Sequence, residues 1–156
     1  MLVLAKFAIT GGAGYIGSNI AISLLKSDNF VKILDKEPIE NQPLLRPFLD
    51  HPNLTFSQID VTCTEKLTSE LVEIDAVFHF SASADIALGR ENPELDLHDG
   101  TIATSSVLES MRKNNVKKII FPSSSTIYGY PKTIPTSEDN GPYFPTSLYG
   151  ASKLAS

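Results

Sequence analysis

The stretch TGGAGYIGS, residues 10–18, constrains the fold of this chain more than any other segment. It follows a short apolar run and opens a helix-like run, so it should join a buried strand to a helix. Gly11 permits a tight turn, Gly14 lets the backbone approach a diphosphate without a Cβ in the way, and Gly17 lets helix and strand pack closely. A diphosphate would bind at the helix N-terminus, on free N–H groups. For the glycines alone, a plain strand-to-helix turn is the alternative.

Strand-like and helix-like runs alternate along the whole chain, and the strand-like runs are continuously apolar. This pattern predicts an α/β fold with a parallel sheet that is covered on both faces. Right-handed crossovers make it a doubly wound, Rossmann-type sheet with strand order 3-2-1-4-5. The expected strands are 6–10, 31–35, 54–60, 75–82 and 116–124, and the expected helices are 16–27 (after the loop), 63–72 (capped by Thr62), 93–114 and one from about 147, with 38–52 as loop containing one turn.

Composition excludes several classes of function. The chain has 156 residues, about one domain, and its net charge is −5 with no Lys/Arg block, so we expect no nucleic-acid partner. Cys63 is the only cysteine, which rules out an internal disulfide and favours a reducing, cytoplasmic location. Lys6 interrupts the apolar start, so neither a membrane span nor a signal peptide is expected. No metal site is predicted.

An acid follows the glycine loop at the spacing of a dinucleotide site. Asp35 ends the second expected strand, eighteen residues past Gly17, where an acid hydrogen-bonds the adenosine ribose and repels a 2′-phosphate. It therefore favours NAD over NADP, although Lys36 beside it could tolerate a phosphate, and a solvated turn Asp is the alternative. Asp60 could take the adenine amino group while Val61 packs on the ring; Asp60 alone would more often be a helix-flanking residue.

Tyr149 and Lys153 lie four residues apart, which places both side chains on one face of a helix. A phenol and an ammonium held together could be a proton-transfer pair, because a cation favours the phenolate. Most such pairs are ordinary surface neighbours, so the spacing alone decides nothing.

Several short motifs occur in order along the chain: TGGAGYIG (10–17), Asp35, DV (60–61), HFSASAD (79–85), PSSSTIYG (122–129) and YGASK (149–153). Together they resemble the extended short-chain dehydrogenase/reductase family of NAD-dependent nucleotide-sugar epimerases and dehydratases, and most of all its UDP-glucose (UDP-galactose) 4-epimerase branch. The resemblance implies a cofactor site of Gly11, Gly14, Tyr15, Ile16, Gly17, Asp35, Lys36, Asp60, Val61, Phe80, Ser81, Ala82, Tyr149 and Lys153.

The resemblance also implies a catalytic constellation of Ser124, Tyr149 and Lys153. Tyr149 would take the proton of a sugar hydroxyl while hydride passes to NAD, Ser124 would orient the same oxygen, and Lys153 would hold the nicotinamide ribose. Ser123 and Ser125 are neighbours that a one-residue shift could promote to the role of Ser124. The substrate, a UDP-hexose, would contact Ser124, Ser125, Thr126 and Tyr149.

The family's dehydratases carry an Asp-Glu pair in the stretch where this chain has Ser125 and Thr126. With no carboxylate there, elimination of water is disfavoured, and oxidation followed by reduction from the other face, which is epimerisation, is favoured. Thr126 would either contact a sugar hydroxyl or have no specific role in the site.

The chain departs from the family pattern at Gly100, where the family has an Asn that braces the site, and at Ala84, where bacterial sugar epimerases carry a Lys. It also has about half the family's length. We therefore expect residues 1–156 to be an incomplete NAD-binding domain without a C-terminal substrate domain, cut after the Tyr-x-x-x-Lys helix begins and inactive alone. A non-catalytic NAD-binding module and another nucleotide-sugar oxidoreductase or decarboxylase stay open as alternatives, and the resemblance suggests a homodimer.

Overall fold

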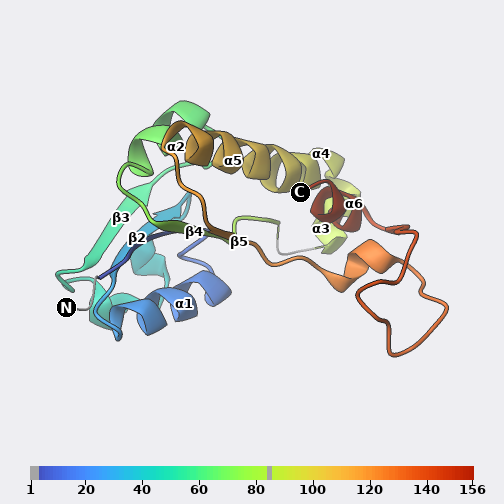
Figure 1. Ribbon diagram of the computed structural model, residues 1–156, viewed down its shortest axis with the longest axis horizontal. Helices are drawn as coiled ribbons and strands as arrows, with labels where there is room; N and C mark the ends of the chain where they lie inside the picture. The colour runs from blue at the N-terminus through green and yellow to red at the C-terminus, as the bar shows by residue number, and fades with distance from the viewer. Residues whose placement is uncertain (1–3, 84–85) are drawn as a thin grey trace. The chain divides into compact units, whose positions relative to one another are not determined.

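The computed structural model describes residues 4–83 and 86–156. It contains a five-stranded parallel sheet of order β3-β2-β1-β4-β5, which confirms the predicted order (Figure 1). The chain divides into two compact units, one of residues 1–81 and 106–121 and the other of residues 82–105 and 122–156. The strands all belong to the first unit: β1 (Lys6–Thr10), β2 (Phe30–Asp35), β3 (Leu54–Gln58), β4 (Ala76–His79) and β5 (Ile119–Ile120).

Helices cover both faces of this sheet, as continuously apolar strands require. Helix α1 (Tyr15–Leu25) lies on one face, and α2 (Thr64–Glu70) lies on the other with the first unit's part of α5 (Ala103–Lys113) (Figure 1). Helix α1 turns Ala21 and Leu25 toward the strands, four residues apart on one helix face. The core they enter consists of Ile9, Ala21, Leu25, Val31, Ile33, Ile39 and Leu45.

The segment 38–52 was expected to be loop with one turn, and it contains two short 3-10 turns, Ile39–Asn41 and Arg46–Phe48. Its order comes from two apolar side chains, because Ile39 and Leu45 are both buried in the core beside β2. A segment with so many prolines therefore packs on the sheet instead of running free over the surface.

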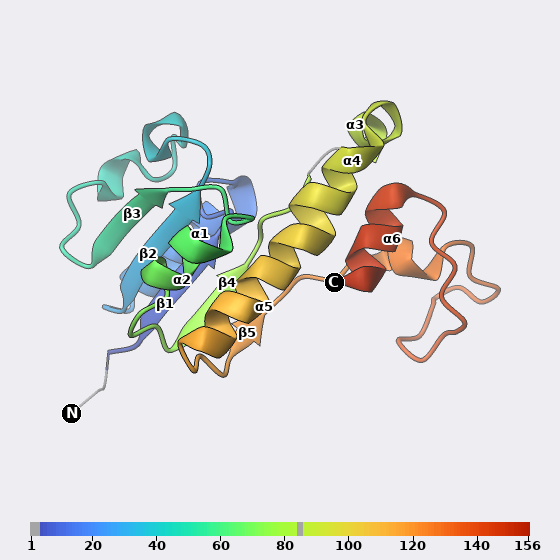
Figure 2. The same cartoon turned by 90° about the horizontal axis from the view of Figure 1, so that it is seen from above.

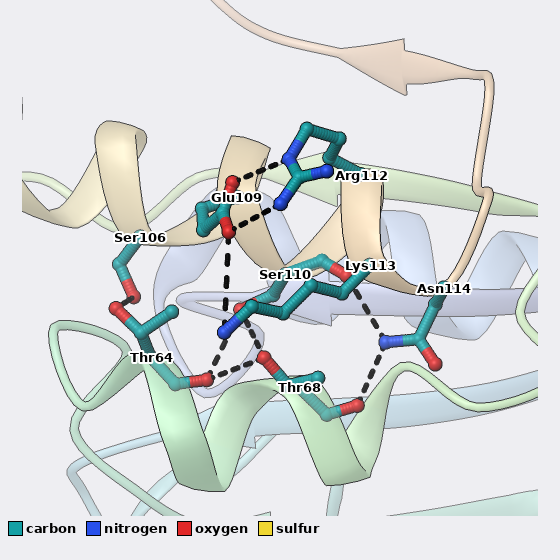
Figure 3. A network of polar contacts seen from close by, with 8 residues as sticks. All are labelled: Thr64, Thr68, Ser106, Glu109, Ser110, Arg112, Lys113 and Asn114. Carbon is teal, nitrogen blue, oxygen red and sulfur yellow. Dashed lines mark hydrogen bonds and ion pairs between the residues drawn. The ribbon is translucent and has the colours of Figure 1, made fainter.

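A seam of hydroxyl and amide groups joins α2 to α5 within the first unit (Figure 3). Thr64 and Ser106 share a hydrogen bond of 2.9 Å between their hydroxyls, and the Thr68 hydroxyl donates to Ser110 at 3.1 Å. The Asn114 amide donates to the Thr68 carbonyl at 2.8 Å. Each of these polar groups thus has a partner on the facing helix, as polar groups removed from water require.

Several expected boundaries were wrong. The fourth strand ends at His79 instead of 82, and the third ends at Gln58 instead of 60. The fifth is only Ile119–Ile120, because it pairs with β4 alone and only over those two residues. Thr62 does not cap α2: the cap position is Cys63, and both the backbone N–H and the hydroxyl of Thr62 donate to Asp60 instead.

The second unit contains α3 (Ile86–Glu91), α4 (Pro93–Asp96) and α6 (Leu148–Ala155) (Figure 2). The expected helix 93–114 is one continuous run, but its segment Leu97–Ile102 is π-helical, with an extra residue in the turn. Helix α6 begins as predicted, with the Ser147 hydroxyl accepting the Gly150 N–H at 3.0 Å. Within the residues that the structure describes, no helix has the length and apolar character needed to cross a membrane.

Candidate cofactor and catalytic site

The glycine loop depends on close backbone contacts that a side chain would prevent. Gly11 has φ +67°, and a Cβ there would lie 2.7 Å from the Ser81 nitrogen and 2.8 Å from the Phe80 carbonyl carbon. The loop therefore touches the chain just after β4 through its backbone. The Gly14 N–H closes the turn by donating to the Gly11 carbonyl at 3.1 Å. Gly11 thus has the tight-turn role predicted for it.

Gly17 was expected to bring helix and strand together, and it packs against the loop instead. A Cβ there would collide with the Gly11 carbonyl oxygen and lie 2.7 Å from the Gly12 Cα. Gly12 itself was not among the predicted residues, yet a Cβ on it would lie 2.7 Å from the Ile33 side chain. The doublet Gly11-Gly12 was the available signal. At Gly14, a Cβ would meet only the Gly11 carbonyl, at 3.2 Å, so this glycine leaves the outer surface of the loop bare.

The start of α1 presents backbone N–H groups with no side-chain cap. The first intrahelical bond runs from Ser18 N–H to the Gly14 carbonyl at 3.0 Å, so the N–H groups of Tyr15, Ile16 and Gly17 precede the helical ladder. The Tyr15 and Ile16 residues are 77% and 58% exposed. Two N–H groups on exposed residues at the positive end of a helix, behind a surface without side chains, fit a diphosphate.

Asp35 is buried and hydrogen-bonded, unlike the solvated turn residue of the alternative interpretation. It is 9% exposed, and its carboxylate accepts the Ala13 N–H at 2.9 Å and the Glu37 N–H at 3.0 Å. A carboxylate has about four acceptor positions, so Asp35 supports the glycine loop with two of them and has about two left. Lys36 is exposed beside it.

The positions of the remaining predicted cofactor residues give less information about cofactor binding. Asp60 is exposed and accepts from Thr62, while Val61 is buried and leaves little surface for an adenine ring. Phe80 packs against the core beside the glycine loop, and Ala82 belongs to the second unit. His79 is fully buried, shares a hydrogen bond of 2.7 Å with Thr10 and stacks on Phe121, so it packs inside the fold. Ala84 lies outside the described residues.

In the second unit, Ser124 has its acceptor positions filled by Thr126. The Ser124 Oγ accepts the Thr126 N–H at 3.3 Å and the Thr126 hydroxyl at 2.8 Å. A hydroxyl has two acceptor positions and one donor, so Ser124 is left with its proton to donate. Thr126 therefore has a role that the sequence did not reveal, which is to orient Ser124. Ser123 and Ser125 are exposed.

Helix α6 brings Lys153 against Tyr149. The Lys153 Nζ lies 5.8 Å from the centre of the Tyr149 ring and donates to the Pro122 carbonyl at 3.2 Å. Because Lys153 is 7% exposed, burial lowers the pKa of its ammonium group. Since Pro122 lies two residues before Ser124, this bond ties the Tyr149 helix to the Ser124 segment.

Two glycines let the backbone of α6 approach its neighbours in this unit. A Cβ on Gly150 would lie 2.9 Å from the Thr126 carbonyl oxygen. A Cβ on Gly100 would lie 2.6 Å from the Ser152 hydroxyl oxygen and 3.0 Å from its Cβ. An Asn at position 100, as in the family, would thus require the Ser152 side chain of α6 to move away from the π-helical turn.

The comparisons with known proteins agree with this geometry. Residues 7–156 match the sequence model described as "NAD dependent epimerase/dehydratase family". The UDP-glucose 4-epimerase of Bacillus subtilis (strain 168) is 36% identical over 150 residues, which are 94% of this chain and 44% of that protein. The chain spans about half the length of the curated relatives it matches.

Solved structures give the same result. The UDP-N-acetylglucosamine 4-epimerase from Methanobrevibacter ruminantium M1, in complex with UDP-N-acetylmuramic acid, is 32% identical with a TM-score of 0.87, over 99% of this chain and 48% of that one. The UDP-glucose 4-epimerase from Brucella ovis, in complex with NAD, is 27% identical with a TM-score of 0.84, over 96% and 45%. With the glycine loop, its acid and the Tyr-x-x-x-Lys helix all in place, this chain belongs to the NAD dependent epimerase/dehydratase family.

Proposed function

We propose that residues 1–156 bind NAD and supply the proton-transfer groups of a nucleotide-sugar epimerase. The observation that carries the proposal is the glycine loop, whose open N–H groups lie beside an acid that is bonded to the loop itself. The Brucella ovis relative, whose structure contains NAD, supports this choice of cofactor. Asp35 would accept the ribose hydroxyls and repel the 2′-phosphate of NADP.

Calorimetric titration of this chain with NAD and NADP tests the cofactor part. Like charges about 4 Å apart repel by roughly 1 kcal/mol in water and roughly 4 kcal/mol near a protein surface. NADP should therefore bind about 10-fold more weakly or worse. Asp35→Asn keeps one acceptor and removes the charge, so it should narrow the gap between the two cofactors. Equal affinities for NAD and NADP in the wild-type protein would contradict the role given to Asp35.

The proposed chemistry assigns one task to each residue of the second unit. Bound NAD supplies an acceptor that takes a hydride from the sugar and returns it. Tyr149 takes and returns the proton of the sugar hydroxyl, and Lys153 holds a cation against the Tyr149 ring. Ser124 donates its hydroxyl proton to the same oxygen, because Thr126 occupies its acceptor positions. UDP-glucose and UDP-galactose are the proposed pair of sugars, on the strength of relatives such as the Bacillus subtilis protein.

Turnover separates this proposal from the non-catalytic NAD-binding module that the chain's length also allows. Relatives contain a further half that this chain does not match, and we assign recognition of nucleotide and sugar to that half. For residues 1–156, calorimetry should thus detect NAD binding and a coupled assay with UDP-galactose and NAD should detect no turnover, so the longer protein is the one that separates the two alternatives. In a longer protein that contains them, Tyr149→Phe should lower turnover about 10²–10⁴-fold and leave NAD affinity nearly unchanged. Near-normal turnover of Tyr149→Phe would disprove the assignment.

A homodimer belongs to the proposal as well. Helix α6 exposes Leu148 and Leu154, at 47% and 41%. Sedimentation of the purified protein at several concentrations measures the association directly.

A further inference from the structure

The Ala13 backbone, in the middle of the glycine loop, is held from both sides by side chains. Its N–H donates to the Asp35 carboxylate at 2.9 Å, and its carbonyl accepts from the Gln42 side-chain amide at 2.9 Å. The next N–H, that of Gly14, donates to Gly11 at 3.1 Å. Both peptide groups that flank the Ala13 Cα are therefore fixed in orientation, one by an acid and the other by Gln42 and Gly11.

Gln42 is well placed to act as a rigid support. It follows the turn Ile39–Asn41, and Ile39 and Leu45, three residues away on either side, are both buried in the core. Its own amide oxygen accepts the Leu44 N–H at 3.3 Å. With the oxygen facing a donor and the nitrogen facing the Ala13 carbonyl, only one orientation of the amide satisfies both contacts.

The peptide group that Gln42 holds leads directly into the N–H groups that face the diphosphate. Gly14 is the residue before α1, and the N–H groups of Tyr15 and Ile16 follow it. A displacement of Ala13 and Gly14 would move the chain that leads into these donors, and it would also disturb the bond from the Ala13 N–H to Asp35. We propose that Gln42 is a positioning residue for NAD, acting through Ala13 to set both the diphosphate donors and the acceptor positions of Asp35. This inference rests on the proposed function, NAD binding at the glycine loop.

Replacing Gln42 by Glu distinguishes positioning from simple structural support. The two side chains have the same length, but a glutamate can donate to the Ala13 carbonyl only when its carboxyl is protonated. The carboxylate would set negative charge against that carbonyl and near Asp35. The charged neighbours along this segment, Asp35, Lys36, Glu37, Glu40 and Arg46, are present in the wild-type protein too. The wild-type titration therefore corrects for their contribution to any change with pH.

The experiment measures the dissociation constant of NAD by calorimetry from pH 4 to pH 8, together with thermal unfolding without NAD over the same range. The proteins are the wild type, Gln42→Glu, Gln42→Ala, and Asn41→Asp as a control that adds the same charge at the exposed neighbouring residue. Gln42→Ala should weaken NAD about 5- to 10-fold at every pH, the size of one hydrogen bond. Gln42→Glu should bind about 10-fold or more weakly at pH 8, where its carboxyl is ionised, and should recover part of that loss at pH 4, just below the ordinary glutamate pKa of about 4.3. Asn41→Asp should follow the wild type.

Two results overturn the inference, and they are distinguishable from failure of the proposed function. If the wild-type protein binds NAD but Gln42→Glu binds equally well at pH 8, Gln42 does not position the loop. If the loss in Gln42→Glu does not change with pH, or follows only the loss of thermal stability, Gln42 is a structural residue. If the wild-type protein does not bind NAD, the proposed function fails and this inference fails with it.

Discussion

Replacing Asp96 by asparagine should make the protein more stable at neutral pH, which is unusual for a change at a buried position. Asp96 ends helix α4 and is 2% exposed, and neither carboxylate oxygen bonds any of the residues that the structure describes. The carboxylate packs against Gly89 of α3, where a Cβ would collide with it. Burial raises the pKa of Asp96, and the nearby charge of Asp99 adds to that effect.

The magnitude follows from the cost of an unpaired polar group. A buried polar group without a partner costs about 1–3 kcal/mol, and more when it is charged. Asparagine keeps the shape of Asp96 and removes the charge, but its amide is also unpaired. The gain in the free energy of unfolding should therefore be on the order of 1 kcal/mol at pH 7, rather than the full cost of the charge.

The pH dependence has a definite sign. The folded protein holds the Asp96 proton more tightly than the unfolded chain does, so the free energy of unfolding falls as pH rises. The contribution of Asp96 is complete below about pH 3.9, the ordinary pKa of an aspartate, and is lost as pH rises through the raised folded value. The asparagine variant has no such slope. Its advantage should thus vanish near pH 4 and grow toward pH 7.

Urea unfolding between pH 4 and pH 8 measures this difference. Glu94→Gln is the matched control, because Glu94 is exposed on the same helix and should change nothing. Asp99→Asn should reduce the slope without abolishing it, since burial is the larger cause. Parallel curves for wild type and Asp96→Asn, or a less stable asparagine variant at pH 7, would refute the reasoning.

Three further outcomes are expected. Gly100→Ala should lower the free energy of unfolding by about 1–2 kcal/mol, because its Cβ overlaps Ser152, and Ser152→Gly in the same chain should recover part of the loss in urea unfolding. Ser110→Ala should cost about 1 kcal/mol through the polar seam, whereas Ser105→Ala, exposed on the same helix, should be neutral. The difference in free energy of unfolding between Lys153→Met and the wild type should favour the Met variant more at pH 7 than at pH 10. Burial lowers the pKa of Lys153, so burying this residue is costly while it is charged and less costly once it has lost its proton.

The sheet could be predicted because its signal is local. Apolar runs such as Lys6–Thr10 and Phe30–Asp35 are recognisable by themselves, and their alternation with helices leaves few arrangements. Strand ends could not be predicted so well. Ile119–Ile120 belongs to a longer apolar run, and its strand length is set by pairing with β4, which no local pattern encodes. Thr62 failed as a cap because Asp60, two residues earlier, accepts its hydrogen bonds.

The site shows the same division. Gly11 and Asp35 could be identified from their spacing along the chain, because Gly11 directly follows β1 and Asp35 ends β2, beside the loop whose Ala13 N–H it accepts. Gln42 could not be identified from the sequence, because it lies 29 residues from Ala13 in a segment that was predicted to be loop. Thr126 was predicted as a substrate contact. Its hydrogen bond to Ser124 depends on the 3-10 turn Ser125–Tyr128, which the sequence pattern did not predict.

Gly100 shows how a departure from a family pattern can be read physically. Its meaning lies in the partner residue, because Ser152 occupies the space that a larger side chain would need. Gly150, two residues earlier on α6, makes a similarly close contact with Thr126, which in turn orients Ser124. Helix α6 therefore meets its neighbours closely at two points, through the Ser152 side chain at Gly100 and through its own backbone at Gly150. In a relative with Asn at the position of Gly100, the residue at the position of Ser152 must make room, so the two positions should change together. In this chain, the absence of a side chain at Gly100 lets Ser152 of α6, the helix that carries Tyr149 and Lys153, lie directly against the π-helical turn.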